Sequence, residues 1–304
     1  MYSNRKKFKI VIANIKNLHY SSSYDVVVMP QGLGDILFFC MYAQEYKRIH
    51  NCNRLALVVT KKHFKDLAKI YKACFEKIIY IDEQIFSSVN MNKFTFLYSK
   101  IYDDNSPKER LVDAIKDAMN VPQTANAYYP MIYIRKSEKR RIDKIGVPFG
   151  KGILIAPDAV SCSIDMTQQD WINIADMLSS MGYTVFFNSK NPNLYGKYKK
   201  IFLSVRETII FTHYAGAFIG FRSGLCDVIA AFSDCNQFII YPNNRMKGEF
   251  KSITNYDSNP NEKYMHYCSL QYTFPDRNIF EYIYKKENLM QKIKEVFKNG
   301  KNFG

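Results

Sequence analysis

Apolar runs alternate with helical patterns along the first half of the chain. Short apolar runs predict buried strands at 25–29 (DVVVM), 54–60, 78–81 and 94–98. Helical patterns are predicted at 36–49, at 62–71, and from the capping box SPKE at 106–109. Strands and helices that alternate in this way favour a parallel, doubly wound α/β sheet.

The second half repeats this alternation. Apolar runs predict strands at 153–156, 183–187, 218–221 and 237–241. Capping boxes beginning at Thr167 and Ser204 predict the starts of two helices, and Gly182 is expected to close the first of them. A long amphipathic helix is predicted at 279–297.

The two halves are separated by a dense run of charges, RKSEKRRIDK, at 135–144. We interpret this run mainly as a solvated linker, with a basic binding patch as the alternative. The predicted organisation is therefore an N-terminal domain at 1–145 and a second domain at 146–275. A C-terminal helix follows within 276–304, and one arrangement for it is to pack back across the cleft between the two domains.

The net charge of the chain narrows the classes of molecule that it is expected to bind. Lysine and arginine outnumber aspartate and glutamate by 43 to 28, so the formal net charge is +15. A positive field of this size favours nucleotide phosphates, nucleic acid or an anionic bilayer surface, and a lysine-rich solubilising surface is the alternative. Nucleic acid fits poorly because the lysines are spread along the chain and not clustered with aromatic residues.

Several signals of other chemistries are missing from the sequence. The seven cysteines form no CxxC pair, and the five histidines show no metal-ligand spacing. There is no DxD, HExxH, Walker or GxSxG motif. We therefore expect metal-free chemistry, no resident cofactor and a reduced cytosolic setting. No apolar run approaches the roughly 18 residues of a membrane span, so any membrane attachment is expected to be peripheral.

The first candidate site is the sequence QGLGD at 31–35, directly after the first predicted strand. Gly32 and Gly34 allow a sharp turn and a close approach to a ligand, with Gln31 beside them. Leu37 stands where a dinucleotide fingerprint needs its third glycine, which argues against a nicotinamide or flavin enzyme. Asp35 is either a catalytic base or a charge that satisfies the helix dipole, and both interpretations stay open.

The second candidate is the polar insert in FIGFRSGLCDVIAAF, where a predicted strand meets a predicted helix. Ser223 and Gly224 are expected to leave backbone amides exposed at the helix start, where anions bind. Arg222 adds a planar, permanently charged group suited to phosphate. The alternative for Arg222 is an ion pair with Asp227.

Two polar loops make up the third candidate. They follow the strands at 153–156 and 183–187, and they contain Ser161 and Ser163 in one loop and Asn188 and Ser189 in the other. Parallel strands bring these loops to the same sheet edge as Arg222. Their hydroxyl and amide groups suit a ribose or a diphosphate.

These motifs carry a family resemblance. The GLGD turn resembles the GDxxxxTP-type start of the heptosyltransferase-like family 9 glycosyltransferases. The segment 153–190 resembles the first βαβ unit of their donor domain, and RSGLCD at 222–227 is similar to their (D/R)(T/S)GL-x-(H/D) donor motif. The resemblance runs in order through most of residues 25–245.

The resemblance implies a GT-B fold, with two Rossmann-like domains of doubly wound parallel sheet facing a cleft. It places the acceptor on the first domain and the nucleotide-sugar on the second, without a metal, and it makes Asp35 the base that deprotonates the acceptor hydroxyl. Arg222 and Asp227 stand where heptosyltransferases usually carry Asp and His, and Asp170 precedes Trp171 in place of Lys or Arg. These departures leave the sugar and the nucleotide base of the donor undetermined.

The predicted function is metal-independent, inverting glycosyl transfer from a nucleotide-sugar to a saccharide or lipid-linked saccharide. Its expected setting is bacterial surface polysaccharide or glycoconjugate synthesis, in the cytoplasm or on the inner face of the cell membrane, with anionic lipid as a further partner and nucleic acid not expected. Alternatives are a nucleotide-sugar epimerase of the same fold and a non-catalytic protein that binds anions or nucleic acid. The predicted donor-binding residues are Ser161, Ser163, Asn188, Ser189, Arg222, Ser223, Gly224 and Asp227. The predicted acceptor-side residues are Gln31, Gly32, Gly34 and, as catalytic base, Asp35.

Overall fold

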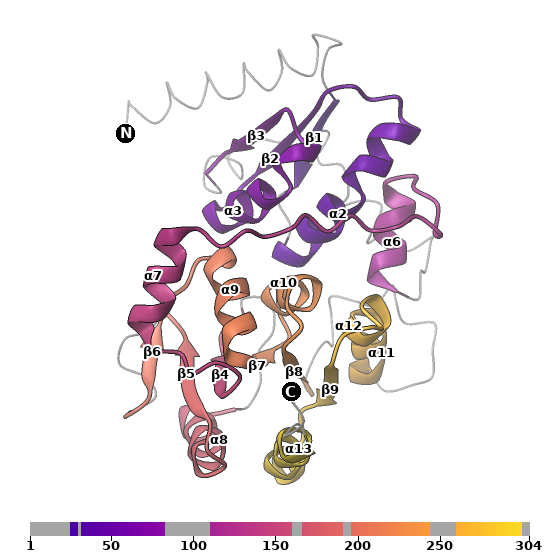
Figure 1. Cartoon of the computed structure of the whole chain (residues 1–304). Coiled ribbons are helices and arrows are strands. Elements are labelled where there is room, and N and C mark those ends of the chain that lie inside the picture. Colours follow the sequence, from indigo (N-terminus) through magenta and orange to yellow (C-terminus); the bar gives the residue numbers. More distant parts are fainter. Residues whose placement is uncertain are drawn as a thin grey trace, which may run out of the picture. The chain divides into compact units, whose positions relative to one another are not determined.

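A computed structural model describes residues 25–29, 32–82, 110–159, 166–190, 196–243 and 260–299 (Figure 1). The chain forms two compact units, Met1–Met131 and Ile132–Gly304, which we call unit 1 and unit 2. Both contain parallel strands connected by helices, so the predicted α/β class is confirmed.

In unit 1 the described strands form a parallel sheet in the order β1-β2-β3. The strands are β1 (Asp25–Met29), β2 (Leu55–Val59) and β3 (Lys77–Tyr80). The helices are α2 (Leu33–Ile49), α3 (Lys62–Ile70) and α6 (Leu111–Ala118), with a 3-10 turn at Lys72–Cys74. Every residue of β2 is buried, as expected of a central strand with apolar neighbours on both faces. The predicted strand at 94–98 and the capping box at 106–109 lie outside the described residues, and Arg110 is the N-cap of α6.

Six parallel strands form the sheet of unit 2, in the order β6-β5-β4-β7-β8-β9. They are β4 (Gly152–Ala156), β5 (Thr184–Asn188), β6 (Lys199–Ile201), β7 (Gly216–Phe221), β8 (Asn236–Tyr241) and β9 (Ile279–Ile283). Counted from the first strand of the unit, this order is the 3-2-1-4-5-6 arrangement of the Rossmann fold.

Helices cover both faces of this sheet, which makes it doubly wound (Figure 1). The helices of unit 2 are α7 (Lys136–Ile145), α8 (Gln168–Ser180), α9 (Val205–Ala215), α10 (Gly224–Phe232), α11 (Pro260–Tyr267), α12 (Leu270–Thr273) and α13 (Lys286–Asn299). Trp171 of α8 and Phe297 of α13 share one buried cluster with Ile155 of β4. On the opposite face, Phe211 of α9 packs edge-on against Phe186 of β5, with ring centroids 5.1 Å apart.

Both predicted capping boxes in unit 2 are confirmed. Thr167 and Ser204 are the N-caps of α8 and α9, and their hydroxyls accept the amide protons of Asp170 and Glu207. In return, the two carboxylates accept the backbone N–H groups of their cap residues, at 2.8 Å for Thr167 and 2.9 Å for Ser204. These caps fix where each helix leaves the sheet.

The charged run at 135–144 is a helix, α7, so its interpretation as a linker is wrong. Glu138 accepts the Arg135 amide proton at 2.9 Å and pairs with Arg206 of α9 at 2.6 Å. Ile142, one turn further on, is buried. Because these contacts attach α7 to unit 2, the chain divides after Met131 and not after residue 145.

The C-terminal segment also differs from its prediction. Residues Ile279–Ile283 form strand β9, which pairs in parallel with β8, and the helix begins only at Lys286. A short apolar run such as IFEYI fits either a helix turn or an edge strand, so the sequence pattern alone did not separate this strand from the helix that follows it. Leu289 and Ile293 of α13 belong to the buried core of unit 2, so the segment is part of that unit.

Candidate functional site

The strand order of unit 2 reverses between β4 and β7, which lie side by side in register. The chain passes from β4 through α8 to β5 on one side, and from β7 through α10 to β8 on the other. In open α/β sheets, ligands bind outside the carboxyl ends of the strands at such a switch point. The turn Arg222-Ser223 leaves the carboxyl end of β7 at this place and leads directly into α10.

Tight packing places the start of α10 close against β7. A Cβ added to Gly220 would lie 2.6 Å from Cε1 of Phe218 and 2.8 Å from Sγ of Cys226, so no side chain fits at this position. The Cys226 thiol donates to the Phe221 carbonyl at 3.2 Å. Burial raises the pKa of Cys226 to about 11, so this thiol is a packing residue and not a nucleophile.

No N-cap side chain satisfies the amides at the start of α10. The Ser223 hydroxyl accepts no backbone N–H group of the first turn, while the Cys226 amide donates to the Ser223 carbonyl at 2.9 Å. The amides of Gly224 and Leu225 precede the first position that can bond to a carbonyl of the same helix. Both residues are half-buried, and the helix start therefore provides backbone donors of the kind that bind anions.

Arg222 and Asp227 form a buried, bidentate ion pair at this turn. Their side chains meet through N–O distances of 2.8 and 2.7 Å, and their exposed fractions are 4% and 2%. Burial by itself lowers the pKa of Arg222, but the Asp227 carboxylate together with the side chains of Tyr241, Cys268 and Tyr264 raises it, and the pKa lies well above its usual value. The ion-pair alternative for Arg222 is thus confirmed.

The remaining donors of Arg222 bind the backbone. Nη1 donates to the carbonyl of Ser223 at 2.9 Å, and Nε and Nη2 donate to the carbonyl of Cys268 at 3.3 and 3.2 Å. All three guanidinium nitrogens therefore have partners within the protein. Arg222 holds the turn and the segment around Cys268 together, and a direct bond to phosphate would require it to give up one of these contacts.

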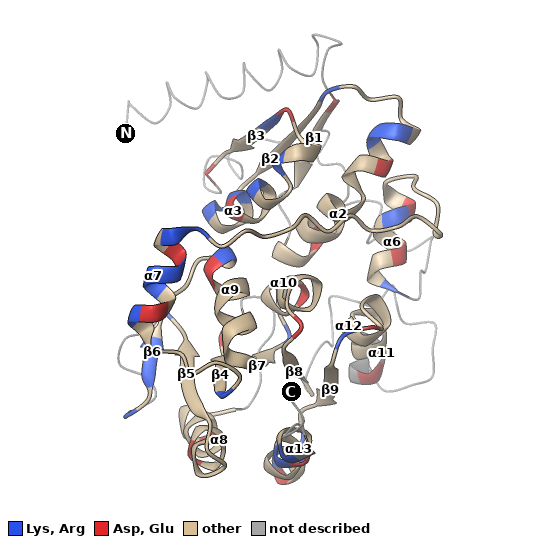
Figure 2. Cartoon of the chain, in the orientation of Figure 1, with Lys and Arg blue, Asp and Glu red and all other residues tan. Residues whose placement is uncertain are grey.

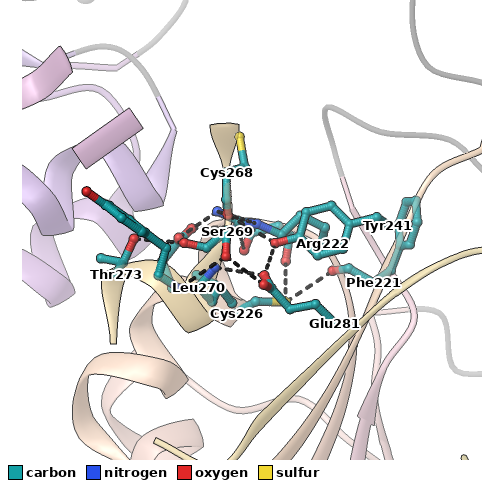
Figure 3. Close-up of polar contacts among 12 residues, drawn as sticks. Phe221, Arg222, Cys226, Tyr241, Cys268, Ser269, Leu270, Thr273 and Glu281 are labelled. Atoms are coloured by element: carbon teal, nitrogen blue, oxygen red, sulfur yellow. Dashed lines mark hydrogen bonds and ion pairs between the residues drawn. The ribbon is translucent and has the colours of Figure 1, made fainter. Parts of the chain in front are cut away.

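A second acidic group extends this network from β9 (Figure 3). The Glu281 carboxylate accepts the Leu270 amide proton and the Ser269 hydroxyl proton, both at 2.7 Å. The Tyr241 hydroxyl, at the end of β8, bonds to Glu281 and lies 3.0 Å from the Cys268 carbonyl oxygen. The network thus fastens residues 268–270 to the carboxyl ends of β7 and β8 and to the middle of β9.

Sequence reasoning missed Glu281, Tyr241 and the 268–270 segment. The available signal was a lone carboxylate in the apolar run IFEYI, which is unusual for a strand unless the acid has partners. The interpretation of 279–297 as one helix gave Glu281 no role.

The polar loops after β4 and β5 meet as expected. The Ser189 hydroxyl donates to Asp158 at 2.9 Å, which joins the two loops at this edge. Asn188 accepts the Leu203 amide proton at 3.2 Å, so its carbonyl oxygen supports the chain that follows β6. Ser161 and Ser163 lie outside the described residues.

In unit 1, Asp35 lies in the first turn of α2 and is buried. Its Oδ2 accepts the Gly32 amide proton at 2.7 Å, which is the return half of a capping box. A Cβ at Gly32 would come within 3.1 Å of the same oxygen, so glycine lets the carboxylate approach closely. Gly34 is buried within the helix, and Gln31 lies outside the described residues. The capping role is observed, and the role of base is a separate proposal.

Metal-ligand groups and membrane-spanning helices are both absent from the part of the chain that the structure describes. In it, no three His, Cys, Asp or Glu side chains are grouped so as to hold a metal ion. No helix in the same ranges is both long and apolar enough to cross a membrane.

Solved structures share this fold. A family 9 glycosyl transferase from Veillonella parvula aligns with a TM-score of 0.55 and 12% identity, covering 92% of each chain. The E. coli heptosyltransferase WaaC, solved with ADP, aligns at 0.53 and 11% identity over 91% of this chain and 99% of that one. E. coli ADP-heptose lps heptosyltransferase II aligns at 0.52 and 10% identity, with coverages of 90% and 98%.

No family model and no curated protein matches the sequence. At identities of 10–12% the structural likeness shows the fold. The predicted architecture of two Rossmann-like domains is confirmed.

Proposed function

We propose that the protein is a glycosyltransferase that moves a sugar from a nucleotide-sugar donor to a saccharide acceptor. The observation that carries the proposal is the start of α10, where backbone amides lie at the switch point of a Rossmann sheet. One protein that shares the fold, E. coli heptosyltransferase WaaC, was solved with ADP and with ADP-2-deoxy-2-fluoro heptose, which supports a nucleoside diphosphate as the ligand.

The leaving diphosphate is the group that the start of α10 stabilises. Its amide donors and the positive end of the helix dipole are fixed before reaction, so they stabilise developing negative charge without rearranging. In this proposal, backbone amides stabilise the negative charge that a divalent cation stabilises in other transferases. The donor site is in unit 2, with Asn188, Ser189, Ser161 and Ser163 in the neighbouring loops.

Arg222 and Asp227 act as positioning residues in this proposal. Because the guanidinium bonds to both Ser223 and Cys268, it fixes the turn that aims the amides of Gly224 and Leu225. The ion pair thus contributes to donor binding through the geometry of the turn. This revises the direct phosphate contact expected for Arg222.

Asp35 is the general base of the proposed reaction. An acceptor hydroxyl attacks the anomeric carbon as its proton passes to the carboxylate, the bond to the diphosphate breaks, and the configuration inverts. The Gly32 amide holds one oxygen of Asp35 in place, which orients the carboxylate at the start of α2. The acceptor is accordingly assigned to unit 1.

A substitution at the first position of α10 tests the proposal. Gly224→Pro removes one amide proton, yet proline is well tolerated at the first position of a helix, and Ser223 already has the extended backbone that must precede it. We expect the affinity for the preferred nucleoside diphosphate, chosen by thermal shift from ADP, UDP and GDP, to fall by about 1.5–3 kcal/mol, the size of a hydrogen bond to a charged group. Calorimetry with purified protein measures it.

The matched control is Gly224→Ala, which keeps the amide and should keep the affinity. Titrations in excess EDTA and in magnesium should give the same constant, because the backbone and not a cation binds the phosphates. Unchanged affinity in a folded Gly224→Pro protein would show that the diphosphate binds somewhere other than the start of α10. Binding that vanishes in EDTA would contradict the metal-free mechanism.

A further inference from the structure

The basic run at 135–144 is not used by the proposed transfer reaction, and its helix has a distinctive outer face. Lys136, Arg140 and Lys144 follow each other at intervals of four residues, so they line one face of α7. Glu138 and Ile142 lie on the opposite face and are buried. Figure 2 shows the resulting concentration of basic residues on α7 and the adjoining β6.

The acidic residues of α7 do not neutralise this face. Glu138 pairs with Arg206, and Asp143 pairs with Lys139 at 3.0 Å. In the described ranges, Lys136, Arg140 and Lys144 have no ion-pair partner. Three exposed cations therefore remain in a row.

Exposed aromatic side chains adjoin the same helix. Arg141 of α7 donates to the Phe202 carbonyl at 2.9 Å, and the Phe202 side chain is 57% exposed. Lys190 lies over the Phe202 ring, 5.6 Å from its centroid. On the other side, Tyr133 is 74% exposed just before α7, and its carbonyl accepts a bond from Arg206. β6 also adjoins the helix, since Lys199 donates to the Ile145 carbonyl.

We propose that this surface docks the protein on an anionic lipid bilayer. We call it the α7 surface and define it as Lys136, Arg140, Lys144, Lys190, Lys199, Tyr133 and Phe202. Basic residues on a surface element are attracted to acidic headgroups, and aromatic rings settle at the level of the headgroups. Exposed rings among cations also suit nucleic acid, whose bases stack on aromatic side chains, so a competing nucleic acid is one arm of the test. A row of three cations on one helix face is the arrangement that an acidic headgroup layer attracts, and this is the occupant we propose.

The test compares two pairs of lysine or arginine residues spaced by four on different helices. Arg140→Gln/Lys144→Gln removes two charges from the α7 surface, and Lys294→Gln/Lys298→Gln removes two exposed charges from α13. The full-length proteins are sedimented with vesicles of phosphatidylglycerol and phosphatidylcholine, and with phosphatidylcholine alone. No sugar donor is present, so a negative result leaves the transferase proposal standing.

We expect the α7 pair to lower partitioning onto the acidic vesicles about 30-fold, the effect of two charges near such a surface, and the α13 pair to lower it far less. Raising the salt should weaken binding of the unaltered protein steeply. Phe202→Ser should lower the binding that persists at high salt.

Four outcomes overturn the proposal. One is equal binding to neutral vesicles, and another is equal loss from both charge pairs, which would make net charge the cause. The third is the absence of binding at low salt. A duplex DNA or RNA that competes with the vesicles and shows the same dependence on Arg140 and Lys144 would assign the α7 surface to nucleic acid instead.

Discussion

The two units each contain the tetrapeptide pattern Gly-Leu-X-Asp at a turn from strand to helix, and they use it differently. In unit 1 the pattern is GLGD at 32–35, and its glycine is the N-cap of α2. In unit 2 it is GLCD at 224–227, and its glycine is the first residue of α10, with Ser223 as N-cap. The helix therefore starts one residue earlier relative to the aspartate in unit 2.

That shift of one residue rotates the aspartate by about 100° around the helix. Asp35, at the third helical position, reaches back to the Gly32 amide and occupies the helix start. Asp227, at the fourth, turns into the core and meets Arg222. One helix start is thus capped by its own acid, whereas no side chain caps the other. This difference is what the proposed roles of the two turns, acid chemistry in unit 1 and anion binding in unit 2, depend on.

The largest effect is expected from Asp35→Asn. Asparagine is about the same size and its side-chain oxygen can still accept the Gly32 amide proton, so stability should change little. It cannot take a proton from the acceptor hydroxyl, and loss of a positioned base typically costs about 10²–10⁴-fold in kcat. The rate is measured as release of nucleoside diphosphate from the donor.

Affinity for the diphosphate should stay near that of the unaltered protein, because the site proposed for it lies in unit 2. A variant with full kcat would limit Asp35 to its capping role and make the contrast between the two turns purely structural.

The next effect is expected from Arg222→Met, which leaves Asp227 buried without its partner. Breaking a buried ion pair in this way costs about 3–5 kcal/mol of stability. Burial then remains to raise the pKa of Asp227 above its value in the unfolded chain. Since a raised pKa gives stability only while the group is protonated, the variant should lose further stability as the pH rises through that pKa.

Urea unfolding at several pH values measures both effects. The control is Arg222→Met/Asp227→Leu, in which no charge is left buried. It should regain part of the stability that Arg222→Met loses, and it should show none of the added pH dependence. Asp227→Leu is measured alongside, and a double variant whose loss equals the sum of the Arg222→Met and Asp227→Leu losses would show that the pair is not coupled.

Patterns within single elements predicted much of the fold. Strands β4, β5, β7 and β8 and the capping boxes at Thr167 and Ser204 are local signals, and the structure confirms them, whereas the three-residue edge strand β6 was not predicted. The segment IFEYI was harder because an apolar run of five residues fits either a strand or a helix turn. Its pairing with β8, about 40 residues earlier in the chain, makes this segment a strand.

The site was only partly predictable for the same reason. The sequence indicated that Arg222 lies at the turn after β7, but its two alternatives depended on burial, which long-range packing sets. Cys268 lies 46 residues from Arg222, and the carbonyl that it provides carries no signal in the sequence. The difference between Asp35 and Asp227 depended on where each helix starts, and a shift of one residue is below the resolution of sequence patterns.

The smallest effects compare the glycines close to the two turns. Gly220→Ala puts a methyl group 2.6 Å from the Phe218 ring and 2.8 Å from the Cys226 sulfur, so α10 must shift from β7, and overpacking of this kind costs about 1–3 kcal/mol. Gly32→Ala needs the Asp35 carboxylate to move by only a few tenths of an ångström from a contact of 3.1 Å, and Gly32 has an ordinary extended backbone. The Gly32→Ala variant should lose about 0.5 kcal/mol of stability, the difference between glycine and alanine as N-caps.

Thermal unfolding ranks the two stabilities, and calorimetry with the diphosphate shows the functional contrast, because only Gly220→Ala moves the amides of α10. Equal losses of affinity from both substitutions would mean that the start of α10 is not the phosphate site.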